Sequence, residues 1–142
     1  MKKITILLIA FSLCACSTNN TQMVNPWISY TTLNEAKSNI SFDVICPKVK
    51  GATYQVMNKE LFEMDYEDIS LRKSKSNEDI SGDYNEYDHT WDMNCDGISV
   101  FCKGKEDKIH CAVWYRESFA YSMTSQSGIT EEKLHNIISN FK

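Results

Sequence analysis

Short runs of alternating apolar and polar residues dominate the middle of the chain. Six of them are separated by polar turns and cover residues 54–57, 61–66, 69–73, 98–102, 109–115 and 119–123. An extended piece at 42–46, which ends at Pro47, is a candidate for a seventh. Because successive side chains of a strand point to opposite faces of a sheet, this pattern predicts an antiparallel meander of six or seven short strands.

Two helices are predicted to flank these strands. Thr32 and Glu35 have the spacing of a capping box, in which each side chain satisfies a free backbone N–H, and predict a short helix over 33–40. Near the other end, Thr130 is the predicted N-cap of a second helix. Its apolar positions share one stripe that we expect to lie on the sheet: Leu134, Ile137, Ile138 and Phe141. The predicted fold class is therefore α+β, an antiparallel sheet with a short N-terminal helix and a C-terminal helix packed on it.

Residues 74–97 interrupt the alternation with a polar, acidic stretch. A loop this long in a small domain is either functional or disordered. Its aromatic residues favour a packed loop, because disordered segments are poor in them. Tyr84, Tyr87 and Trp91 are candidate binding residues, since Tyr and Trp dominate recognition surfaces. For the two tyrosines, packing against the domain is an equal alternative.

The first sixteen residues have the order of a secretory signal peptide: a short positive segment, a ten-residue apolar run and then small residues. The apolar run is too short to span a bilayer, which takes about 20 residues. The four residues that end at Cys16, Leu-Cys-Ala-Cys, resemble a bacterial lipobox. That resemblance implies cleavage before Cys16 and a diacylglycerol thioether on its sulfur, with acyl chains such as palmitate. The alternative is an ordinary signal peptide that is cut nearby.

The expected organisation is a lipoprotein signal peptide at 1–15, a polar tether at 16–25 and a single α+β domain at 26–142. Lipid on Cys16 would hold the protein on the extracytoplasmic face of the cell membrane, since two acyl chains suffice for stable anchoring. The chain has 15 basic and 19 acidic side chains. Loss of Lys2 and Lys3 leaves 13 basic against 19 acidic, a net charge of −6. An acidic domain repels nucleic acid, so no nucleic-acid partner is expected.

Four cysteines remain after the predicted cleavage, and they are Cys46, Cys95, Cys102 and Cys111. An even number in an exported domain permits two disulfides. If Glu106 and Asp107 form a two-residue hairpin turn, Cys102 lies opposite Cys111, within reach of a disulfide. Cys46 and Cys95 are then left for each other by elimination. Four free thiols are the alternative, because export alone does not prove oxidation.

No metal or cofactor site is expected. Residues 92–97 match the first half of a calcium loop, but the twelfth position is Lys103 rather than the usual glutamate. An Asp-Gly turn that enters a strand is the favoured interpretation. The three histidines have no second ligand at helical or strand spacing. The sequence also lacks a glycine-rich phosphate loop and a Gly-x-Ser-x-Gly elbow, so no enzyme activity is predicted.

The run Glu-Asp-Ile-Ser-Gly-Asp-Tyr-Asn at 78–85 carries a resemblance, together with Arg72-Lys73, 112–114, Tyr121-Ser122 and the closing Thr-Glu-Glu helix. Over residues 26–142 the chain resembles an uncharacterised exported domain family of Gram-positive anaerobes. Members occur as lipoproteins and as the extracytoplasmic ends of anti-sigma-factor-like membrane proteins. The resemblance implies a small α+β domain with a sensory or binding role and supplies no catalytic residues. The four mature cysteines are not part of its pattern.

The predicted function is that of a membrane-anchored extracytoplasmic lipoprotein of the cell envelope with a non-catalytic binding or sensory domain. Its expected partners are the membrane, through the lipid on Cys16, and an unidentified protein or small-molecule ligand. The alternatives are a structural or interaction protein of the envelope and, less favoured, an extracellular hydrolase. A hydrolase should have a cleft with titratable groups of shifted pKa, a binding module a groove, and a structural protein neither.

Overall fold

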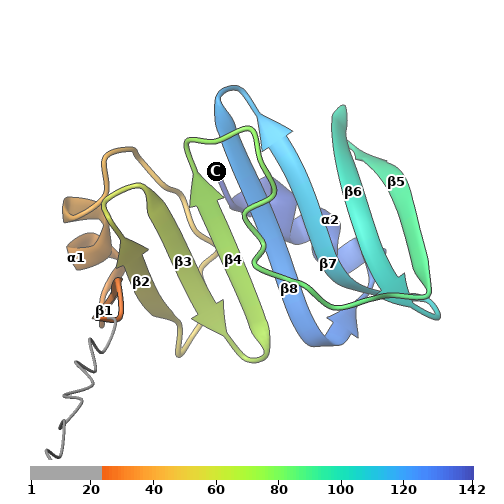
Figure 1. The fold of residues 1–142 in the computed structure, drawn as a ribbon, viewed down its shortest axis with the longest axis horizontal. Helices are drawn as coiled ribbons and strands as arrows, with labels where there is room; N and C mark the ends of the chain where they lie inside the picture. Colours follow the sequence, from red (N-terminus) through yellow and green to blue (C-terminus); the bar gives the residue numbers. More distant parts are fainter. Residues whose placement is uncertain (1–23) are drawn as a thin grey trace, which may run out of the picture.

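The computed structural model of this protein describes residues 24–142. Its strands are β1 Trp27–Tyr30, β2 Thr53–Met57, β3 Leu61–Tyr66, β4 Ile69–Ser74, β5 His89–Cys95, β6 Ile98–Lys105, β7 Lys108–Arg116 and β8 Phe119–Ile129. Two helices, α1 Leu33–Ser38 and α2 Glu131–Asn140, complete the fold. The strands form one antiparallel sheet in the order β1-β2-β3-β4-β8-β7-β6-β5 (Figure 1). Cys16, the predicted signal peptide and most of the predicted tether lie outside the described residues.

The α+β class is confirmed, but the sheet has eight strands rather than six or seven. β1 and β5 were not predicted. β5 lies in the polar stretch that was expected to be a loop, because its Asp and Asn residues are poor strand formers. The extended piece at 42–46 is not a strand of this sheet. It runs beside the end of the chain instead, where Ile45 and Lys142 exchange two backbone hydrogen bonds of 2.6 and 2.9 Å.

One face of the sheet, the helix face, carries the core. Figure 1 shows α2 behind β8 and β7. The register pairs Leu71 of β4 with Met123 of β8, and Tyr121 of β8 with Trp114 of β7. All four side chains are buried in the core cluster with those of α2. The alternation of β4 and β8 thus supplies one apolar surface on which a helix can pack.

The helix ends follow the predicted capping. Thr130 accepts a hydrogen bond from the Lys133 backbone N–H, and the predicted stripe of α2 is buried, with Phe141 fully inaccessible to solvent. At α1, Thr32 and Glu35 form the capping box. The helix ends at Ser38, slightly earlier than predicted, and Asn39 is its C-cap.

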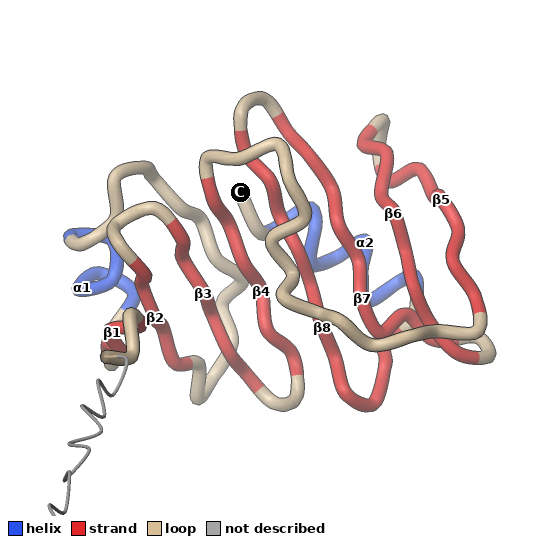
Figure 2. Tube along the Cα trace, viewed as in Figure 1, coloured by secondary structure: helices blue, strands red, loops and turns tan. Residues whose placement is uncertain are grey.

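The opposite face, here called the loop face, is crossed by the β4–β5 loop, residues 75–88. Figure 2 shows this connection passing over β8 and β7 to reach the start of β5. The sheet residues beneath and beside it are the alternate, mostly polar residues of the same strands, such as Ser70, Arg72 and Thr124. The space between this loop and the sheet contains the candidate site.

The predicted Cys102–Cys111 disulfide is wrong. Lys105 pairs with Lys108 at the hairpin tip as predicted, but the register shifts between Lys103 and Gly104. Cys102 therefore pairs with Ala112, and Cys111 pairs with Lys103. A one-residue shift reverses the face to which later side chains point, so the two sulfurs lie on opposite faces of the sheet.

The four cysteines among residues 24–142 are all free, so the predicted Cys46–Cys95 bridge is wrong as well. It had been inferred only by elimination. Cys95 ends the edge strand β5, whereas Cys46 follows the segment that pairs with the end of the chain, beside Lys37 and Lys73. The two thiols thus lie against different parts of the sheet.

Candidate functional site

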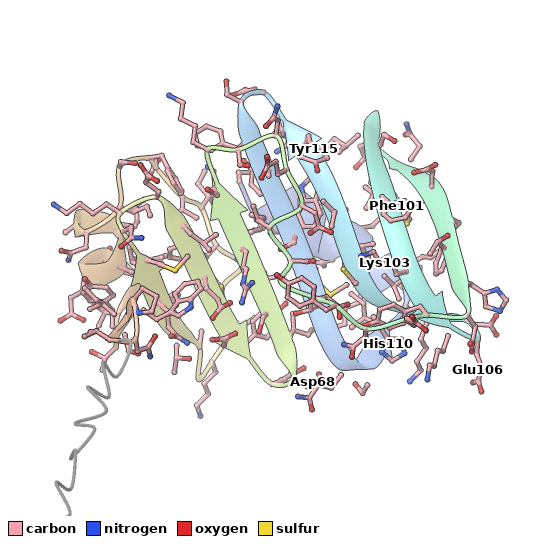
Figure 3. The ribbon with its side chains drawn as sticks, viewed as in Figure 1. Asp68, Phe101, Lys103, Glu106, His110 and Tyr115 are labelled. Carbon is pink, nitrogen blue, oxygen red and sulfur yellow. The ribbon has the colours of Figure 1, made fainter. Side chains whose placement is uncertain are left out.

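A polar cleft of about 570 Å³ lies between the β4–β5 loop and the lower part of the loop face. Its floor comes from β4 and β8, one wall from residues 81–87 of the loop, and the far side from β7 and the β6–β7 turn. In Figure 3, Asp68 marks the lower end of β4 and His110 the lower end of β7, with β8 between them. Strands that are distant in sequence therefore build a single concave surface.

Arg72 fastens the loop over this surface. Its Nη1 donates to the backbone carbonyls of Ile80 and Ser81, at 3.2 and 2.9 Å, while Nε forms an ion pair with Glu63. Gly82 lies directly on the guanidinium with φ of +65°, and a Cβ at this position would overlap Nη1. A side chain here would push the Arg72 guanidinium aside, and the positive φ also favours glycine.

The loop also orders itself through its own polar side chains. Asp79, Ser81 and Asp83 each accept a hydrogen bond from the backbone N–H two residues further on, at 2.8, 3.2 and 3.0 Å. These turns are the local alternative to secondary structure that short polar side chains offer. Two of the acidic residues of this loop thus have a structural role in shaping the wall of the cleft.

His110 and Tyr87 close the far side. His110 is the extra residue of a β-bulge, because Ile109 pairs with Gly104 and Cys111 with Lys103. Its ring stacks on Tyr87, with centroids 5.7 Å apart, and its Nδ1 lies 3.1 Å from the Ser125 carbonyl. A carbonyl only accepts, so Nδ1 carries a proton.

Asp83 holds Tyr87 in place. The Tyr87 hydroxyl donates to Asp83 Oδ2 at 2.6 Å. Burial, and then this hydrogen bond, raise the pKa of Tyr87 to about 12. Burial opposes ionisation of Asp83, but the hydrogen bonds from Tyr87 and Asn85 outweigh it and keep the pKa of that carboxyl below its usual value. The pair is therefore a neutral phenol on a carboxylate at physiological pH.

Asp68 fixes the lower edge of the cleft. Its Oδ2 accepts from Ser127 Oγ at 2.6 Å, from the Ser127 backbone N–H at 2.7 Å and from Ser125 Oγ at 3.0 Å. These hydrogen bonds, led by the Ser127 hydroxyl, lower the pKa of Asp68 to about 2. Ser125 thus joins both sides of the cleft, through its hydroxyl to Asp68 and through its carbonyl to His110.

Cys111 lies beneath the loop and is completely buried. Burial raises the pKa of its thiol to about 11. Only the thiolate is a strong nucleophile, so this sulfur is unreactive near neutral pH. Lys103, next to it, lies 3.6 Å from an oxygen of Asp79 and adds a further attachment between loop and sheet.

The predicted binding residues are only partly brought together. Tyr87 lines the cleft, whereas Tyr84 is 95% exposed on the outside of the loop. Trp91 belongs to β5 and packs on the core from the helix face, opposite Cys102. Arg72, Asp68 and His110 were not predicted as site residues. The sequence did contain a signal for Arg72. Arg72 and Lys73 are adjacent in a strand, so one of the two cations must lie on each face of the sheet.

The Asp-Gly turn at 95–98 is confirmed. Asp96 and Gly97 both have positive φ, of 51° and 86°, and Asn94 Oδ1 accepts from the Gly97 N–H at 2.9 Å. These dihedrals are those of a type I′ hairpin turn. In the part of the chain that the structure describes, no group of three or more His, Cys, Asp or Glu residues is placed to hold a metal ion.

Comparisons with known proteins add no relative. Within residues 24–142, no helix is long and apolar enough to cross a membrane. No protein-family model, no curated protein and no solved structure matches this chain.

Proposed function

We propose that this protein is a lipid-anchored extracytoplasmic lipoprotein whose domain is a non-catalytic binding or sensory module, with its ligand site in the polar cleft of the loop face. The cleft is the observation that carries the proposal. Its volume of about 570 Å³ falls within the usual range of small-molecule pockets. It is also preformed, because Arg72 and the Tyr87–His110 stack hold the loop that walls it.

The shifted pKa values of Asp68, Tyr87 and Cys111 do not suit these three groups to acid–base catalysis. A general acid or base works best with a pKa near the operating pH. Here the pKa shifts lead away from neutrality: Asp68 falls to about 2, whereas Tyr87 and Cys111 rise to about 12 and about 11. Each of these groups therefore keeps a single protonation state across the physiological range.

The anchor rests on the sequence of residues 1–16 and on the place where the domain begins. β1 starts at Trp27, so the predicted tether from Cys16 would reach the domain at the edge of its sheet (Figure 1). The resemblance to exported lipoproteins supports the same placement. A sigma-factor gene beside the gene for this protein would favour the sensory form of the proposal.

Replacement of Cys16 tests the anchor. Cys16→Ser should move the protein from the membrane fraction to the soluble extracytoplasmic fraction or block its maturation, since the thioether can no longer form. Cys14→Ser is the matched control, because this residue is predicted to leave with the signal peptide. Normal maturation and membrane retention of the Cys16→Ser protein would show that Cys16 is not the anchor.

A blocked cleft tests the binding role. Thr124 lies on the cleft floor, opposite Ser70 of β4, whereas Ser99 is exposed on β6 and does not line the cleft. We expect a small molecule to co-purify with the wild-type full chain and with the Ser99→Tyr variant. The same molecule should be absent from the Thr124→Tyr variant. The same content in all three samples, measured by mass spectrometry, would contradict the proposed site.

An interaction protein of the envelope is the second candidate. Phe101 and Tyr115 are 40% and 47% exposed, and both lie on the loop face beyond the cleft (Figure 3). Exposed aromatic side chains are frequent at protein contacts. Loss of a cross-linked partner in a Phe101→Ser/Tyr115→Ser double variant, with the Thr124→Tyr protein unaffected, would favour this candidate over small-molecule binding.

A further inference from the structure

We infer that the cleft takes a neutral, hydroxyl-rich ligand of the saccharide class. This inference rests on the proposed function, because it names the ligand of that same cleft. It follows from which polar groups of the lining already have partners in the protein and which do not.

Three charged side chains of the lining, Asp68 exposed and Arg72 and Asp83 half-buried, already have protein partners. Arg72 is paired with Glu63, and its Nη1 is bound by two carbonyls. Asp68 accepts three hydrogen bonds from two serines. Asp83 accepts from the Tyr87 hydroxyl and from the backbone and side chain of Asn85. A charged ligand that used these groups would have to displace the charge-assisted hydrogen bonds that they already make.

Two charged residues of the lining, Glu86 and Lys105, have no ion pair among residues 24–142. Both are exposed, one on the loop and one at the end of β6. They have opposite signs, so they give the opening no preference for anions or cations. Exposed ion pairs also contribute only about 0–1 kcal/mol, which is too little to select a charged ligand.

Neutral polar groups are what the cleft offers a ligand. Neither the Thr124 hydroxyl nor the Gln126 side-chain amide makes a hydrogen bond to another group in the described part of the chain. Each of them can both donate and accept. A sugar hydroxyl has the same dual character, so one hydroxyl can satisfy both functions of its partner, which a carboxylate or an ammonium group cannot.

The ring of Tyr87 supplies an apolar part of the site. Tyr87 is held by the His110 stack and by Asp83, so its ring needs no reordering when a ligand enters. Rigid aromatic rings supply contact area for the C–H face of a pyranose ring at low entropic cost. A volume of about 570 Å³ leaves room for a small saccharide with its water.

Saturation-transfer-difference NMR and calorimetry on the full lipidated chain test the inference. A polyoxyethylene detergent keeps sugar and phosphate out of the micelle. The probes are N,N′-diacetylchitobiose and maltose as neutral saccharides, with inorganic phosphate and glutamate as charged controls. We expect a saccharide to bind and its Kd to rise about tenfold in Thr124→Val, which keeps the shape and removes the hydroxyl. Ser99→Ala should leave Kd unchanged.

The outcomes separate this inference from the proposed function. If phosphate or glutamate binds in the cleft and neither saccharide does, the ligand class is wrong and the binding site stands. If no probe binds and the small molecule that co-purifies in a manner sensitive to Thr124→Tyr is not a saccharide, the saccharide class is again wrong. If neither is found, both proposals fail. Binding of soluble disaccharide, as opposed to retention only on insoluble cell-wall glycan, distinguishes a free sugar from a polymer as the source.

Discussion

Arg72 and Lys73 are neighbours on β4, and their side chains leave the sheet on opposite faces. Arg72 reaches the loop face and binds the carbonyls of Ile80 and Ser81. Lys73 reaches the helix face, where Nζ donates to the Asp43 carbonyl at 2.7 Å. Each cation thus holds one long connection against the sheet. Arg72 holds the β4–β5 loop on the loop face, and Lys73 holds the segment between α1 and β2 on the helix face.

The two cations differ in how they are compensated. Arg72 is paired with Glu63, and burial raises the pKa of this carboxylate even though Arg72 lowers it. Lys73 has no ion pair in the described residues and lies over the Phe119 ring, with Nζ 4.4 Å from the centroid. Burial lowers the pKa of Lys73.

The comparison separates an apolar face of the sheet from a polar one. The helix face compensates its cation with aromatic rings and one carbonyl, and it holds the apolar core. The loop face uses ion pairs, turns and carbonyls, and there it leaves a cleft open. We expect the global stability of the domain to depend chiefly on the helix face. The order of the candidate site should depend chiefly on the contacts of the loop face.

The largest effect should come from the helix face. Phe141→Ala should lower the free energy of unfolding by about 3–5 kcal/mol, because its side chain is fully buried and its removal leaves a cavity. Chemical denaturation measures this loss. Phe101→Ala on the loop face is the control and should cost far less, since Phe101 is 40% exposed. Equal losses for the two variants would contradict the assignment of the core to one face.

The two cations give the next prediction. Arg72→Met should cost about 2–3 kcal/mol, since it leaves the Glu63 carboxylate, which is 6% exposed, without its counter-charge. Lys73→Met should cost less, because methionine fits the aromatic surroundings and no buried anion is left behind. Hydrogen exchange should also increase at 80–83 only in the Arg72 variant. If Glu63→Gln does not restore part of the loss in Arg72→Met, the unpaired carboxylate is not its cause.

A pair of glycines isolates the contact between loop and sheet. Gly82 and Gly51 both have positive φ, +65° and +78°, but a Cβ meets Arg72 at Gly82 and nothing within 4 Å at Gly51. Gly51→Ala should therefore cost only the backbone term of about 1 kcal/mol. Gly82→Ala should cost more than this and should expose the loop to limited proteolysis. Equal effects on melting temperature would mean that the loop does not lie on Arg72.

Asp68 gives the smallest effect and depends on pH. Its folded pKa, about 2, lies below the usual 3.8, so its contribution to stability is present above pH 4 and is lost as the pH falls toward 2. Because the group is exposed, we expect Asp68→Asn to lower the free energy of unfolding by less than about 1 kcal/mol at pH 7. The difference between variant and wild type should shrink on acidification. A difference that stays constant from pH 7 to pH 2 would exclude the carboxylate as its origin.

Local signals of the chain predicted the helices and most strands. The capping residues Thr32 and Thr130, the stripe on α2 and the Asp-Gly turn depend on contacts within a few residues, and all of them are present in the structure. Of the residues that line the cleft, only Tyr87 was among the predicted binding residues. Arg72, Asp68 and His110 come from different strands, and spacing along the chain says nothing about such neighbours.

The bulge shows most clearly what only the tertiary structure decided. The alternation of β6 and β7 predicted an uninterrupted register with Cys102 opposite Cys111. In the folded sheet, Gly104 has no side chain, so the Lys108 carbonyl lies where a Cβ would be, and His110 is left as the extra residue. The register shift at this bulge places Cys102 and Cys111 on opposite faces of the sheet. It also places the His110 ring against Tyr87. Sequence alternation determines which residues share a face within one strand, whereas the register between strands depends on backbone contacts that form only when the sheet is assembled.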